Sequence, residues 1–169
     1  MELVAERIAG HSVDHYVTPA MQRGLDLEDA ARNLYEETTG QLLGPARLFI
    51  HPTIPNFVAT PDGTLGLDTV VEFKCPLVST YLNWIDDGRI PDGHLAQMAC
   101  QLVVTGRTKA IFVAYCPEMP PHRRLFIRDY IPTPEALEVV EAAAIQFLKE
   151  VDELFDRVTA TEAPAQEAA

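Results

Sequence analysis

The sequence FVATPDG at residues 57–63, followed by VVEFKCP at residues 70–76, has the pattern of two strands joined by a turn. The first stretch ends in Pro-Asp-Gly, which favours a turn, and the second is rich in β-branched and apolar residues. We therefore expect a β-hairpin in which Asp62 lies at the loop end.

Acidic and basic side chains share one face of the second expected strand. Successive side chains of a strand alternate between its faces, so Glu72 and Lys74 lie on one side, and Val71, Phe73 and Cys75 on the other. Burying charged groups where a core strand would carry Val or Ile costs stability. This cost indicates a functional site.

Asp62, Glu72 and Lys74 have the chemistry of a site that cleaves phosphodiesters. Two carboxylates on neighbouring strands can bind Mg²⁺ through oxygen and leave positions for water and phosphate. Lys74 can orient or deprotonate the attacking water, or stabilise charge on the phosphorus. The spacing Asp-x9-Glu-x-Lys after a proline resembles the PD-(D/E)xK nuclease superfamily. Alone, it also fits a hairpin turn followed by a solvated strand face.

Length and composition predict one domain, at residues 1–158, followed by a disordered tail at residues 159–169. No apolar run approaches the ~20 residues of a membrane span, and the first residues lack a secretory signal. We therefore expect a cytoplasmic protein with no membrane partner. Cys75, Cys100 and Cys116 lack a C-x-x-C spacing, which indicates core thiols rather than disulfides or a zinc site.

The formal net charge of −12 disfavours nucleic acid as a partner, but the charge is unevenly distributed. Residues 133–169 carry nine acidic side chains, whereas residues 89–128 carry six basic and two acidic ones. The acidic segment is typical of a solvated helix and tail. The basic segment directly follows the expected site, and we expect it to supply local contacts to DNA.

The flanking sequence predicts helices at residues 2–9, 18–40, 77–87, 91–105 and from residue 133 onward. The last of these has an apolar face that we expect to pack on the sheet. Further strands are expected at residues 47–50, 56–60, 110–116 and 124–131. The pattern is that of a sheet covered by helices.

Two of the expected helices carry polar side chains that a site could use. Glu28 interrupts a stripe of small and apolar residues, which leaves both an inward-pointing carboxylate and an exposed helix charge open. His94, Gln97 and Gln101 form one stripe at spacings of three and four residues, a pattern that is usually solvated.

Five motifs occur in the order found in the lambda-exonuclease-like, YqaJ-type viral recombinase family of phage alkaline exonucleases. They are GLDLEDAARNLYEETTG at residues 24–40, TPDG at 60–63, EFKCP at 72–76, Gln97 in the helix before TG at 105–106, and YCP at 115–117. The chain resembles this family over most of its length, up to the final helix.

The resemblance implies an α/β fold with a restriction-endonuclease-like core, in which a central mixed β-sheet is flanked by helices. It implies that Asp62, Glu72, Glu28 and the Phe73 carbonyl bind Mg²⁺, with Mn²⁺ as an alternative ion. Two ions can activate water and stabilise the leaving oxygen.

The resemblance also assigns roles to two neighbouring side chains. Lys74 would act on the attacking water, and Gln97 would hold the nucleophile or a phosphate oxygen. Glu28 and Gln97 thereby complete the implied catalytic set of Asp62, Glu72 and Lys74.

Members of this family digest duplex DNA from the 5′ end and leave a 3′ overhang for a single-strand annealing recombinase, and some form ring-shaped trimers. We therefore expect a Mg-dependent 5′ to 3′ exonuclease of phage-type recombination that acts on double-stranded DNA ends. Two alternatives stay open: a structure-specific or restriction-like endonuclease on the same core, and a degenerate DNA-binding or partner-binding protein with little turnover.

The sequence departs from the family pattern at two places. His94 stands where the lambda enzyme has Tyr. We also expect this chain to begin after the family's upstream segment, whose Arg and Ser meet the terminal 5′ phosphate. We therefore expect weak, salt-sensitive digestion with little preference for 5′-phosphorylated ends.

Overall fold

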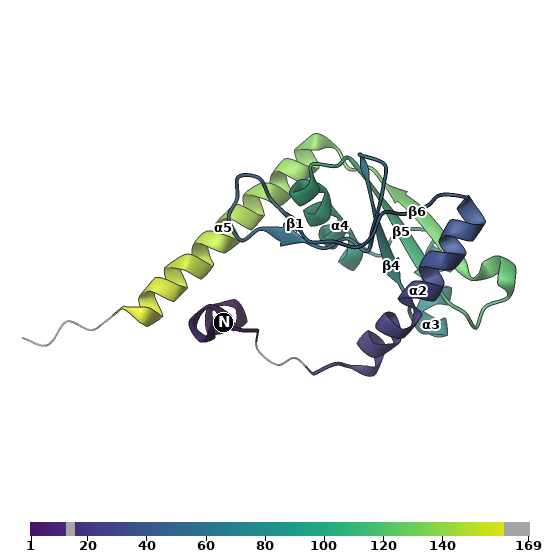
Figure 1. Cartoon of the computed structure of the whole chain (residues 1–169), viewed down its shortest axis with the longest axis horizontal. Helices are drawn as coiled ribbons and strands as arrows, with labels where there is room; N and C mark the ends of the chain where they lie inside the picture. Colours follow the sequence, from purple (N-terminus) through teal and green to yellow (C-terminus); the bar gives the residue numbers. More distant parts are fainter. Residues whose placement is uncertain (13–15, 161–169) are drawn as a thin grey trace, which may run out of the picture.

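The structure, a computed structural model, describes residues 1–12 and 16–160 (Figure 1). Its helices are α1 (Glu2–Ala9), α2 (Pro19–Thr39), α3 (Val78–Asp87), α4 (Asp92–Thr105) and α5 (Pro134–Thr159), with a short 3-10 turn, η1 (Pro121–Arg123). Its strands are β1 (Phe49–Ile50), β2 (Val58–Ala59), β3 (Gly63–Leu65), β4 (Thr69–Lys74), β5 (Lys109–Tyr115) and β6 (Leu125–Tyr130). The predicted helices and strands are therefore all present, although the first two strands are shorter than expected.

A four-stranded mixed sheet in the order β3-β4-β5-β6 forms the centre of the molecule. β4 and β5 run parallel, whereas β3 pairs antiparallel with β4, and β6 with β5. A parallel pair needs a long crossover connection, which α3 and α4 provide. The predicted central mixed sheet flanked by helices is confirmed.

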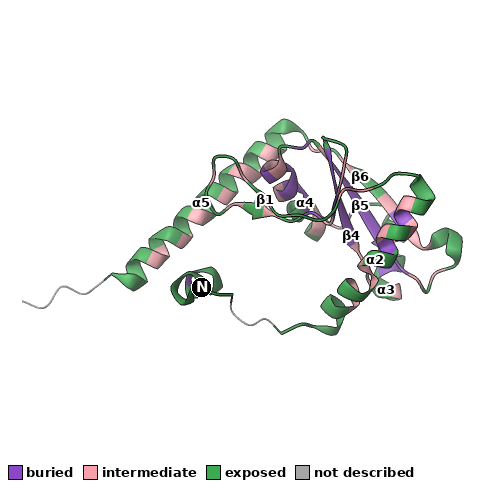
Figure 2. Cartoon of the chain, viewed as in Figure 1, coloured by how far each residue is buried: buried purple, intermediate pink, exposed green. Residues whose placement is uncertain are grey.

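Helices cover both faces of the sheet, and its central strands are coloured as buried in Figure 2. The alternation of side chains along β4 divides the core between the two faces. On one face, Ala31 and Tyr35 of α2 pack against Val71 and Phe73. On the other face, the core contains Val70 and residues of α3 and α4, among them Tyr81, Met98 and Leu102. β4 is buried on both sides, which favours apolar residues such as Val70, Val71 and Phe73, and Glu72 is a buried charge among them.

The predicted hairpin is wrong in its first strand and in its turn. β4 pairs with β3, not with residues 57–60, and the connection between them lies at residues 66–68. Gly66 has φ +60°, a left-handed conformation that glycine adopts without strain. Asp62 consequently lies at the end of the hairpin opposite the turn. This places it beside the C-terminal half of β4.

The predicted strands at residues 47–50 and 56–60 instead form a separate antiparallel ribbon, β1 with β2. Prolines at positions 52 and 55 lack a backbone donor and lie in the connection between the two strands. The ribbon packs against α4. His51 connects it to α5, with 3.7 Å between its Nε2 and Glu141 Oε1.

The prediction that α5 packs on the sheet is wrong, because α5 packs mainly on α4 and its distal part extends away from the sheet (Figure 1). None of its residues is fully buried. Its N-terminal half supplies Leu137 to the core, and Arg7 of α1 pairs with Asp152 near its C-terminal end. Residues 161–169, most of the predicted disordered tail, lie outside the described residues.

The cysteines and the helix lengths bear on two further expectations. Cys75, Cys100 and Cys116 are unpaired, and Cys116 is fully buried whereas the other two are half-buried. The prediction of core thiols is therefore right in full only for Cys116.

In the described part of the chain, residues 1–12 and 16–160, no helix combines the length and apolar character that crossing a membrane requires.

The packing of α4 on the sheet gives a stability prediction. Met98 is 0% exposed in this core, so Met98→Ala should lower the free energy of unfolding by about 2–5 kcal/mol. Val139 on α5 is 69% exposed, and Val139→Ala should change it by less than about 0.5 kcal/mol. Urea unfolding of both variants checks this. Equal losses in the two variants would contradict the assignment of α4 to the core.

Candidate active site

The side chains predicted to form the site converge at the C-terminal end of β4. A cavity of about 500 Å³ opens there between α2, β4 and α3. Four of the predicted residues line it: Glu28, Asp62, Phe73 and Lys74. Glu72 and Gln97 do not line it but contact each other directly beside Lys74.

Glu72 is the buried centre of this arrangement. It is 1% exposed, and its carboxylate accepts hydrogen bonds from three side chains. Lys74 Nζ and Gln97 Nε2 donate to Oε1, the latter at 2.6 Å, and Gln101 Nε2 donates to Oε2 at 2.6 Å. A buried carboxylate is stable only when it is paired and hydrogen-bonded, and here both conditions are met.

Lys74 connects the buried carboxylate to the cavity. Its ammonium group forms an ion pair with Glu72, while its side chain is 27% exposed and lines the cavity. An ammonium has three donors, so Lys74 can hold Glu72 and still present donors to a ligand. The alternation predicted for β4 is therefore what brings acid and amine together.

Asp62 directly precedes β3 and is held in place by the neighbouring strand, β4. Its Oδ2 accepts a hydrogen bond from the backbone N–H of Phe73 at 2.6 Å. Because Phe73 lies between Glu72 and Lys74 in sequence, this bond fixes Asp62 against the end of β4. The predicted proximity of the two carboxylates is thus achieved, although through the opposite end of the hairpin.

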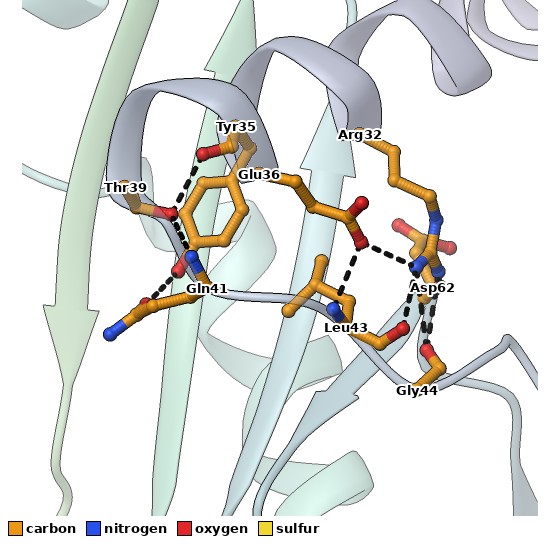
Figure 3. A network of polar contacts seen from close by, with 8 residues as sticks. All are labelled: Arg32, Tyr35, Glu36, Thr39, Gln41, Leu43, Gly44 and Asp62. Atoms are coloured by element: carbon orange, nitrogen blue, oxygen red, sulfur yellow. Dashed lines mark hydrogen bonds and ion pairs between the residues drawn. The ribbon is translucent and has the colours of Figure 1, made fainter.

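An arginine on α2 fixes the backbone around Asp62 (Figure 3). Arg32 donates to the carbonyl oxygens of Asp62, Leu43 and Gly44. Glu36, one turn further along α2, lies 3.6 Å from Arg32 Nη1 and accepts from the Leu43 N–H at 2.9 Å. This network ties the segment after α2 and the start of β3 to the helix.

Gln101 is a site residue that the sequence analysis did not select. It is 3% exposed, and its Nε2 contacts Glu72, but its Oε1 is buried without a hydrogen-bond partner. The spacing of four residues from Gln97 was the available signal. Such a stripe is usually solvated. Gln97 is indeed exposed, although its Nε2 reaches Glu72, whereas Gln101 is buried against the sheet.

Two other titratable side chains near the cavity, His94 and Cys75, are in environments that favour their neutral forms. The imidazole of His94 stacks on Phe112, with ring centroids 5.4 Å apart, and meets the edge of Trp84, and burial lowers the pKa of His94. Burial also raises the pKa of Cys75, which lines the cavity, to about 11. Both shifts favour the neutral side chain, so neither His94 nor Cys75 is favoured as a charged group in the site.

The carboxylates crowd one another electrostatically. The pKa of Asp62 is raised to about 7, first by burial and then by the negative charges of Glu72 and Glu28, against the opposing effects of the Phe73 N–H and Lys74. Glu28 is half-buried at the cavity wall, so its side chain is the inward-pointing carboxylate of the two alternatives. Such a cluster of acids is stabilised by a cation.

The donor set can be compared with the needs of a divalent cation. Within residues 1–12 and 16–160, no group of three or more His, Cys, Asp or Glu side chains is arranged so that it could hold a metal ion. Mg²⁺ commonly uses one or two carboxylates and completes its shell with water and phosphate oxygens. The chemistry of Asp62 and Glu72, both oxygen donors at one strand end, fits an ion of this kind.

Comparisons with known proteins find a matching family and similar solved structures. The sequence profile of the YqaJ-like viral recombinase domain matches residues 1–108. A comparison with curated proteins finds no match. Among solved structures, the chain is similar to the alkaline exonuclease LHK-Exo from Laribacter hongkongensis, with 31% sequence identity and a TM-score of 0.86 over 93% of this chain and 79% of that one.

Two further solved structures are similar. LHK-Exo in complex with dAMP matches at 31% identity and a TM-score of 0.87, over 93% of this chain and 80% of that one. A phage-related exonuclease from Haemophilus somnus 129PT, at 15% identity and a TM-score of 0.70, covers 94% of this chain and 81% of its own, which shows a shared fold. The predicted restriction-endonuclease-like core is confirmed.

The raised pKa of Asp62 predicts how stability depends on pH without metal. Because its native pKa of about 7 lies above the ordinary value near 4, folded Asp62 retains a proton that the unfolded chain has released. Its contribution to stability should therefore fall as the pH rises from about 4 through about 7. Asp62→Asn cannot ionise and should remove this loss.

Thermal unfolding in EDTA checks the sign of this effect. We expect Asp62→Asn to melt above the wild type at about pH 8, and the difference to shrink toward about pH 5. A wild type that melts higher than the variant at alkaline pH would show that the ionised carboxylate is not destabilising.

Proposed function

Because the chain belongs to the YqaJ-like viral recombinase domain family, we propose that it is a metal-dependent exonuclease that degrades double-stranded DNA from its 5′ ends. The observation that carries the proposal is the ion pair between buried Glu72 and partly exposed Lys74, which lies beside Asp62 at the edge of the cavity. An acid, an amine and a second acid at one strand end have the chemistry needed to cleave a phosphodiester.

The metal ligands in this proposal are Asp62 and Glu72, with Glu28 and the Phe73 carbonyl as further oxygen donors. The ion would be Mg²⁺, or Mn²⁺ in its place. When bound, it would lower the pKa of a water molecule and neutralise charge on the phosphate. The pKa of Asp62 is raised first by burial and then by the negative charges of Glu72 and Glu28. The second cause supports the proposal, because a cation relieves repulsion between carboxylates.

Lys74 and Gln97 act on the reacting groups in this proposal. Lys74 is anchored by Glu72, so its remaining donors can orient the attacking water and stabilise charge on the phosphoryl oxygens. Gln97, held against the same carboxylate, can hold the water or a phosphate oxygen through its carboxamide. Gln101 keeps Glu72 oriented from the other side.

The substrate and partners follow from the same proposal. LHK-Exo has been solved with dAMP, a deoxynucleoside monophosphate of the kind that stepwise digestion of DNA releases. We propose double-stranded DNA ends as the substrate, and a single-strand annealing recombinase as the protein that receives the remaining strand. A homotrimer is the assembly that the family resemblance implies.

Replacement of the amine tests the catalytic assignment. Lys74→Ala should lower the rate of nucleotide release from linear duplex DNA in Mg²⁺ by about 10²–10⁴-fold, because a positioned catalytic group contributes roughly this factor. Lys149 of α5 pairs with Glu153 in an exposed i,i+4 arrangement, and Lys149→Ala is the matched control with full activity expected. Cleavage by Lys74→Ala near the wild-type rate would refute the role of Lys74.

A covalently closed duplex separates an exonuclease from an endonuclease on the same core. The wild type should digest linear duplex DNA with Mg²⁺, leave the closed circle intact, and lose activity in EDTA. Nicking or linearisation of the circle would favour the endonuclease. No turnover on either substrate would favour a degenerate DNA-binding protein.

A further inference from the structure

The cavity beside the site carries a second basic side chain, on α2. Among the described residues that line this cavity, Arg23 and Lys74 are the basic ones, and Glu28 and Asp62 are the acidic ones. Two carboxylates repel a DNA phosphate, so a phosphate that enters the cavity needs cationic partners. Arg23 supplies one of them, and neither the metal motif nor the helix pattern had indicated it.

Arg23 is held in a fixed orientation by groups from two other segments. Its Nε donates to the carbonyl oxygen of Cys75 at 3.2 Å, and its Nη2 donates to Glu118 at 2.8 Å. Cys75 directly follows Lys74, so the first bond places the guanidinium next to the end of β4. The side chain is 21% exposed, which leaves part of it accessible from solvent.

Glu118 forms with Arg23 a pair of the kind that a phosphate could replace. The hydrogen bond from Arg23 lowers the pKa of Glu118 to about 2, so Glu118 is an anion at neutral pH. The guanidinium fork binds carboxylate and phosphate oxygens in the same geometry. The Glu118 side chain is 46% exposed, and an ion pair of this exposure contributes little to stability.

We infer that Arg23 binds a DNA phosphate in the cavity and that Glu118 holds its guanidinium in position until the phosphate displaces the carboxylate. The inference rests on the proposed function and adds to it a residue that positions the substrate. Since the net charge is −12, binding of DNA depends on a few local cations of this kind.

A purely structural role would give different results. If Arg23 only ties α2 to the end of β4 and to the loop of Glu118, removing either partner of the ion pair should have the same effect. If Arg23 binds phosphate, the two replacements should act in opposite directions, because Glu118 competes with the DNA. This difference makes the pair testable through binding alone.

The test measures binding of a fluorescently labelled linear duplex by anisotropy in Ca²⁺ at several salt concentrations. Arg23→Gln should raise Kd by roughly ten-fold or more, as expected for loss of a hydrogen bond to a charged group. It should also reduce the slope of log K against log salt by about 0.9, the value for one phosphate contact. Glu118→Gln should bind at least as tightly as the wild type.

A matched pair of controls lies on α1 and α5, which contribute no residue to the lining of the cavity. Arg7 and Asp152 form an ion pair with 2.6 Å between Nη1 and Oδ1. The replacements Arg7→Gln and Asp152→Asn change the net charge in the same way as Arg23→Gln and Glu118→Gln. Both should retain the wild-type Kd and salt slope. Melting temperatures of all four variants monitor the fold.

Two results would overturn the inference. One is an Arg23→Gln variant that melts like the wild type and retains its Kd and salt slope. The other is a Glu118→Gln variant that weakens DNA binding as much as Arg23→Gln does. Nucleotide release in Mg²⁺ by the wild type separates these outcomes from failure of the proposed function, in which the wild type neither binds nor cleaves the duplex.

Discussion

The burial of one carboxylate constrains the rest of this structure. Glu72 lies in the middle of a strand that is covered on both faces, and it is kept there by Lys74, Gln97 and Gln101. Breaking a buried pair by removing one partner typically costs about 3–5 kcal/mol, so the position of α4 and the orientation of Lys74 are tied to this carboxylate. The helix that carries the two glutamines is therefore as much a part of the site as β4.

The second carboxylate, that of Asp62, is held by a backbone N–H, and a side chain holds the backbone around it. Asp62 accepts the Phe73 N–H, and Arg32 holds the surrounding chain through three carbonyl oxygens and Glu36. This arrangement leaves the two acids close together and raises the pKa of Asp62. Stability is thus given up at the strand end, as expected where polar groups are arranged for function rather than for packing.

Sequence patterns within single helices and strands predicted much of this arrangement. The contacts between helices and strands could not be predicted in this way. The alternation of β4 predicted the shared face of Glu72 and Lys74, and Thr18 and Gly40 marked the ends of α2, where both indeed cap the helix. The hairpin was misplaced because turn chemistry occurs at both Gly63 and Gly66, and only strand pairing distinguishes them. The inward orientation of Gln101 and the packing of α5 on α4 also depend on tertiary contacts, which helical periodicity does not contain.

Anomalous diffraction from crystals grown with Mn²⁺ would locate the cation that we propose Asp62 and Glu72 to bind at the end of β4. We predict an anomalous peak between these two carboxylates, next to the Phe73 carbonyl and within reach of Glu28, and its absence in crystals of Asp62→Asn. A strong peak elsewhere, with none at the end of β4 in the wild type, would show that these carboxylates do not bind the cation.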